Sequence, residues 1–154
     1  MSDDPDFSSD LGSDYEAYEK DCSKIRKQNK SYLDLFEKDM IKARLAYSTI
    51  EKHMRNLQLF LDDFLLQEEP LTMVDGLYHL DRFFDFFARK CTWSSPGTVK
   101  TTAASIKKFY KSMLDHGHVN ADQYEELCTE IKECKEDWIE ATIPYDQDDG
   151  FEDW

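Results

Sequence analysis

The sequence has few residues that interrupt helices and no long apolar run. Its 154 residues include only five glycines and four prolines, a composition that favours long helices over many turns. No stretch of about 18 apolar residues is present, so we expect no transmembrane span. The opening MSDDPDFSSD is acidic and polar, which is unlike a signal peptide. We therefore expect a cytoplasmic protein with no membrane contact.

Patterns typical of metal binding or catalysis are also missing. None of the cysteines forms a C-x-x-C pair; they are Cys22, Cys91, Cys128 and Cys134. We expect reduced thiols, mostly buried as small apolar groups. His116 and His118 form an H-G-H turn without an evident third ligand. There is no activating Cys–His motif and no glycine-rich phosphate loop. We predict no metal site, no cofactor, no catalytic residue and no enzyme activity.

Acidic residues dominate the chain but are unevenly distributed. The formal net charge is −14, of which residues 1–22 contribute −7, residues 141–154 contribute −5, and the long middle part only −2. With 40% hydrophobic and 14% aromatic residues, the middle can form a packed core. We expect an acidic N-terminal segment over 1–30, a helical domain over 31–142 and an acidic, aromatic tail over 143–154.

Apolar residues recur at helical spacing, and capping signals precede each run. These patterns predict an all-α fold, a compact bundle of four to five helices. A weak additional helix is expected over 13–28. The main helices are expected to begin after Ser31, after Ser48 (with Glu51 as a capping box), after Thr72, at Ser95-Pro96 and after Asn120. The helix after Ser48 should run to about residue 67, and the one from Ser95-Pro96 to about residue 114.

The segment from Trp93 to Leu114 contains no Asp or Glu. It carries four lysines at positions that fall on one side of a helix: Lys100, Lys107, Lys108 and Lys111. A solvated helix face is the ordinary explanation for such a pattern. Ordinary faces mix both signs of charge, however, and an acid-free cationic helix is suited to a polyanion such as a phosphate backbone.

The helix after Ser48 offers a second basic strip. It presents Lys52, Arg55 and Asn56 opposite its apolar stripe, with His53 to one side. Thr98 and Thr101, near the start of the lysine helix, are expected to donate hydrogen bonds to phosphate.

The last helix and the tail have a different character. From Asp122 to Glu140 there are eight acids against two lysines. Its apolar residues Tyr124, Ile131 and Trp138 are expected either to pack in the core or to form a surface for a partner or a second copy. In the tail, Phe151 and Trp154 lie among acids, a combination that can dock into basic apolar grooves.

The order and spacing of these helices resemble a known module. The segment LDLFEKDMIKARLAYSTIEKHMRNLQLFLDDFL (33–65), followed by PLTMVDGLYHLDRFFDFFARK (70–90) and SSPGTVKTTAASIKKFYKSML (94–114), is similar to the N-terminal core-binding domain of tyrosine recombinases and phage integrases. The similarity covers about residues 31–115 and includes the Phe109-Tyr110 pair near the end of the lysine helix.

The resemblance implies a SAM-like helical bundle whose second and fourth helices face DNA. In this chain those helices carry the two basic strips. No counterpart of the recombinase catalytic domain follows, so we expect a non-enzymatic module that binds duplex DNA. The alternative is a protein-interaction or regulatory module that acts through the acidic last helix and the tails, on a recombinase or another basic protein.

Overall fold

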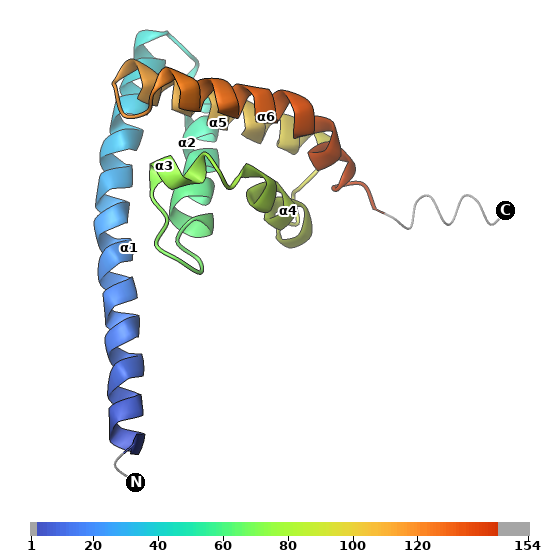
Figure 1. The fold of residues 1–154 in the computed structure, drawn as a ribbon. Coiled ribbons are helices and arrows are strands. Elements are labelled where there is room, and N and C mark those ends of the chain that lie inside the picture. Colours follow the sequence, from blue (N-terminus) through green and yellow to red (C-terminus); the bar gives the residue numbers. More distant parts are fainter. Residues whose placement is uncertain (1–2, 145–154) are drawn as a thin grey trace, which may run out of the picture.

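The computed structural model describes the backbone of residues 3–144 and the side chains of residue 12 and residues 14–144. These residues form six α-helices and one π-helix and contain no strand, so the all-α prediction is confirmed (Figure 1). The elements are α1 Asp3–Lys42, α2 Tyr47–Gln58, η1 Leu59–Phe64, α3 Met73–Gly76, α4 Leu80–Lys90, α5 Pro96–Asp115 and α6 Ala121–Glu140. None of these helices is both long and apolar enough to cross a membrane.

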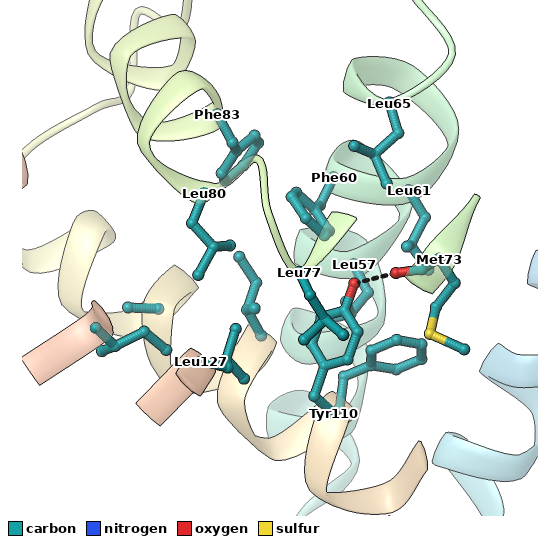
Figure 2. Packing of buried hydrophobic residues seen from close by; sticks show 14 of the residues in the cluster. Leu57, Phe60, Leu61, Leu65, Met73, Leu77, Leu80, Phe83, Tyr110 and Leu127 are labelled. Carbon is teal, nitrogen blue, oxygen red and sulfur yellow. Dashed lines mark hydrogen bonds between the residues drawn. The ribbon is translucent and has the colours of Figure 1, made fainter. Parts of the chain in front are cut away.

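The core lies where α2, η1, α4, α5 and α6 meet (Figure 2). Phe60 and Phe83 pack edge to face, with ring centroids 5.0 Å apart. Tyr110 is fully buried, and its hydroxyl donates a hydrogen bond to the Met73 carbonyl over 2.6 Å. This bond satisfies a polar group that would be costly to bury alone. The helix α5 therefore crosses the middle of the bundle and connects its other elements.

Three of the predicted helix starts are confirmed in detail. Thr72, Ser95 and Asn120 each accept a hydrogen bond from the backbone N–H three residues on, and the side chain at that position accepts one from the backbone N–H of the cap residue. Pro96 occupies the first turn of α5, as predicted. Gly117 ends the α5 region with a φ of +80°, a backbone conformation that favours glycine.

The predicted capping box of Ser48 with Glu51 is wrong. The helix α2 begins at Tyr47, its N-cap is Ala46, and no side chain caps it. The helix was predicted to continue to about residue 67, whereas α2 gives way to the π-helix η1, which ends at Phe64. The predicted helix over 72–90 is also interrupted, because α3 ends at Gly76 and α4 begins at Leu80.

The predicted break before Ser31 is absent, because α1 is one helix of 40 residues. The Ser31 hydroxyl donates to the carbonyl of Lys27 within this helix and caps nothing. Two residues before Ser31, Asn29 is buried, and its amide donates to Asp62 Oδ1 (2.9 Å) and to the Leu61 carbonyl (3.4 Å). The Tyr18 hydroxyl hydrogen-bonds to the Leu66 carbonyl. These contacts hold the middle of α1 against η1 and the residues after it.

The N-terminal part of α1 extends beyond the rest of the bundle (Figure 1). Gly12 and residues 14–17 are exposed, and burial begins at Tyr18. The two long helices α5 and α6, by contrast, pack along each other after a short connection, which makes them an antiparallel pair.

Candidate nucleic-acid interface

The exposed side of α5 carries a row of lysines. Between its buried positions, this helix exposes Lys100, Ala104, Lys107, Lys108 and Lys111. We call these five residues the lysine strip. The opposite side of α5 is buried through Val99, Ala103, Ile106, Tyr110 and Met113. The structure thus places the four lysines together on the surface and keeps them out of the core, as the helical spacing predicted.

The helix α2 packs directly beside α5. Ser105 of α5 connects the two helices, because its Oγ lies 2.6 Å from His53 Nδ1 and accepts a hydrogen bond from Asn56 Nδ2 at 2.9 Å. The Ser105 hydroxyl donates its own proton to the Thr101 carbonyl. Since that proton is already used, His53 Nδ1 must be the donor to Ser105.

His53 therefore does not lie on the surface where the sequence placed it. Its side chain is in the seam between α2 and α5, and only 8% of the residue is exposed. Burial lowers the pKa of His53, and the positive charges of Lys108 and Lys52 lower it further. Lysines from both helices thus disfavour the charged form of the same imidazole.

The remaining α2 residues of the predicted interface vary in exposure. Lys52 and Arg55 are exposed, whereas Asn56 is half-buried and engaged with Ser105. We call Lys52, Arg55 and the lysine strip together the α2–α5 basic surface. The helices α2 and α5 contain only two acids, Glu51 and Asp115.

The two threonines at the start of α5 have internal hydrogen bonds. Thr98 Oγ1 accepts from the Ser95 N–H at 2.8 Å and lies 3.1 Å from the Trp93 carbonyl. Thr101 Oγ1 donates to the Gly97 carbonyl at 3.0 Å. Their hydroxyls are therefore already used in capping and in the helix itself.

A groove that the sequence did not reveal adjoins the lysine strip. It has a volume of about 460 Å³ and lies between the C-terminal ends of α1 and α5. Apolar side chains contribute to its wall, and three lysines line it as well; these residues are Phe36, Met40, Leu45, Lys42, Lys108 and Lys111. No periodicity in the sequence brings residues 36–45 next to residues 108–116, so only the tertiary packing creates this site.

Two carboxylates in the groove are already hydrogen-bonded. Asp39 Oδ2 accepts from Ser112 Oγ at 2.6 Å and lies 3.0 Å from His116 Nε2. Partial burial raises the pKa of Asp39, but the hydrogen bonds from Ser112 and His116 and the nearby positive charges outweigh it and hold the pKa below its usual value. Asp115 pairs with Lys111 at 2.8 Å.

The apolar residues of α6 belong to the core. Ile131 is 7% exposed and Trp138 is 5% exposed, while Tyr124 is partly buried against the same cluster. Trp138 stacks on Phe84, with centroids 4.4 Å apart, and donates from Nε1 to Asp81 at 2.7 Å. Of the two alternatives for these residues, the structure selects core packing, so a partner surface built on Tyr124, Ile131 and Trp138 is wrong. Phe151 and Trp154 lie outside the described residues.

A second groove, of about 350 Å³, lies between α6 and the turn that precedes α4. It is lined by Leu77, Tyr78 and the acidic side of α6, including Glu125, Glu126, Glu130 and Glu133. Burial, together with the charge of Asp81, raises the pKa of Glu130. Among the residues that the structure describes, no group of three or more His, Cys, Asp or Glu side chains is arranged to hold a metal ion.

Comparison of the chain with protein-family models, with curated proteins and with solved structures found no match in any of the three.

Proposed function

We propose that this protein binds duplex DNA through the α2–α5 basic surface and does so without catalysing a reaction. The observation that supports this most strongly is the separation of charge. Two helices that pack side by side carry six exposed cations and two acids, although the whole chain has a net charge of −14. The resemblance to the core-binding domain of tyrosine recombinases selects the same two helices.

The chemistry of the surface suits a phosphate backbone better than a single small anion. The lysine strip extends over twelve residues of α5, or about 16 Å from Lys100 to Lys111 at 1.5 Å per residue, so its ammonium groups can contact several phosphates. Four to six such contacts predict that the logarithm of the binding constant falls with the logarithm of salt concentration at a slope of about −4 to −5.

The test compares two double variants with the same change in net charge. Lys100→Glu/Lys107→Glu reverses charge on the lysine strip, whereas Lys132→Glu/Lys135→Glu does so on α6. Binding to a fluorescent duplex of about 25 base pairs is measured by anisotropy at several salt concentrations. The strip variant should lose at least about tenfold in affinity and about two units of salt slope, while the α6 variant should lose less than about threefold.

Equal losses in both variants would show that only the total charge matters. Absence of salt-sensitive binding by the chain both with and without residues 145–154 would refute the proposal. Circular dichroism and urea unfolding of each variant check that the fold is retained.

A protein-interaction function is the second candidate, and the acidic groove on α6 favours it. Tyr78 is 58% exposed at this groove, beside glutamates that would attract a basic partner. Recovery of a basic protein by the immobilised chain after nuclease treatment, lost in a Glu125→Lys/Glu133→Lys variant, would support this function over DNA binding.

A further inference from the structure

We propose that residues 145–154 of this chain dock along the lysine strip and place aromatic side chains in the groove between α1 and α5. This inference rests on the proposed function, because it describes how the same surface is regulated. The docked segment would occupy the surface to which DNA is proposed to bind.

The composition of the segment complements the surface. Residues 145–154, YDQDDGFEDW, contain five acids, three aromatic residues and no base. The lysine strip supplies four ammonium groups with no acid among its residues. The groove at its end combines apolar side chains with Lys42, Lys108 and Lys111 at the same place, so it can accept an aromatic ring that has carboxylates beside it.

The groove is large enough for such an occupant. Its volume of about 460 Å³ falls within the range of roughly 300–1,000 Å³ that is typical of sites for drug-sized molecules. Phe36 and Met40 border the groove but are almost fully buried, so the apolar surface within reach of a docked ring comes from half-buried Leu45 and exposed Ala43. The carboxylates of Asp39 and Asp115 oppose an acidic segment, but each already has a hydrogen-bonding partner, whereas Lys42 and Lys108 have no ion pair among the described residues.

The segment is also long enough to reach the groove. Because α5 and α6 are antiparallel neighbours, α6 ends beside the start of α5 (Figure 1). The distance along α5 from Pro96 to Lys111 is about 22 Å. Ten extended residues span up to about 33 Å, so the chain beyond Pro144 can follow the lysine strip and bring Phe151 or Trp154 to the groove.

The experiment uses fluorine NMR of the full chain labelled with 5-fluorotryptophan. The chain has three tryptophans, and Trp154→Phe assigns the signal of Trp154. At low salt this signal should lie away from that of a free, labelled peptide of residues 145–154. In Lys108→Glu/Lys111→Glu it should return to the peptide position.

The controls are internal to the chain. Lys132→Glu/Lys135→Glu changes the net charge by the same amount on α6 and should leave the Trp154 signal in place. The signal of Trp138, which is buried against Phe84, reports whether each variant remains folded. A Trp154 signal at the free-peptide position in the unaltered chain would overturn the proposal, as would a signal that shifts with protein concentration, since the latter indicates docking onto a second copy.

Titration with duplex DNA separates this inference from the proposed function. If the segment occupies the DNA-binding surface, DNA should return the Trp154 signal to the peptide position, and Phe151→Ala/Trp154→Ala should raise DNA affinity by about three- to tenfold. If the Trp154 signal shows that the segment is docked but no variant binds DNA, the proposed function is refuted and the docking is not. DNA binding with a free Trp154 refutes the docking alone.

Discussion

At the scale of single residues, Gly76 has the least room for a side chain among the glycines that the structure describes. A Cβ atom at Gly76 would lie 2.8 Å from the Tyr110 hydroxyl oxygen and 2.9 Å from a methyl carbon of Leu65. Glycine here lets α3 approach α5 closely enough for Tyr110 to reach the Met73 carbonyl. The break between α3 and α4, which the apolar pattern did not predict, lies at this close approach.

The chemistry of His53 depends on its neighbours. Its pKa is lowered by burial and by the charges of Lys108 and Lys52. Lys108→Gln should therefore raise the pKa of His53 towards its usual value, while Lys100→Gln, a matched loss of charge on the same helix, should not change it. NMR titration of the His53 ring protons measures both, and equal pKa values in the two variants would contradict this arrangement.

The same shift makes stability depend on pH. An unfolded histidine titrates near pH 6.5, so below that value the unfolded chain binds a proton that folded His53 resists. The contribution of His53 to the free energy of unfolding should then fall as the pH is lowered, by at most about 1.4 kcal/mol per pH unit, until the pH reaches the pKa of the folded state.

At the scale of helices, local patterns in the sequence predicted most of the expected helix starts but not all of the helix lengths. Thr72, Ser95 and Asn120 form capping boxes that depend on residues three positions apart, and such patterns can be read directly. The continuity of α1 depends on contacts between distant residues, such as Asn29 with Asp62. Ser31 resembles a cap in sequence, yet its hydroxyl bonds within the helix.

The two serines predicted as caps provide a matched pair for a stability measurement. Ser95 accepts a hydrogen bond from the Thr98 N–H, so Ser95→Ala should lower the free energy of unfolding by about 0.5–2 kcal/mol. Ser48 lies within α2 and caps nothing, so Ser48→Ala should change it by less than about 0.5 kcal/mol. Urea unfolding measures both; similar losses would mean that Ser48 does cap α2.

The candidate site, like the helices, was predictable from the sequence only in part. The exposure of Lys100, Lys107, Lys108 and Lys111 follows from helical spacing alone. The burial of His53 does not, because it depends on Ser105, which is 52 residues away in the chain. The groove lined by Lys42 and Lys108 was beyond sequence reasoning for the same reason.

At the scale of the whole molecule, α1 is attached to the bundle over only part of its length. Residues 14–17 are exposed, whereas Cys22, Ile25 and Asn29 are buried. A helix without tertiary contacts is only marginally stable in water. Backbone amides from Gly12 to Ala17 should therefore exchange with solvent at least about 100-fold faster than those from Cys22 to Met40.

Hydrogen exchange followed by NMR at neutral pH checks this contrast. The amides of α5 from Ile106 to Met113 serve as the protected reference, since that stretch carries some of the most buried residues of the core. Uniform protection along α1 would contradict this expectation, because it would mean that further contacts stabilise the first part of the helix.

The placement of lysines on α5 and of acids on the neighbouring α6 also gives the molecule an electric dipole. Eight acids on α6 and four lysines on α5 are carried by two helices in contact, so charges of opposite sign face different directions over a short distance. In the field of a polyanion such a molecule rotates before it makes contact, and approaches led by α5 are favoured over those led by α6. Net repulsion slows the encounter, while the dipole determines its orientation.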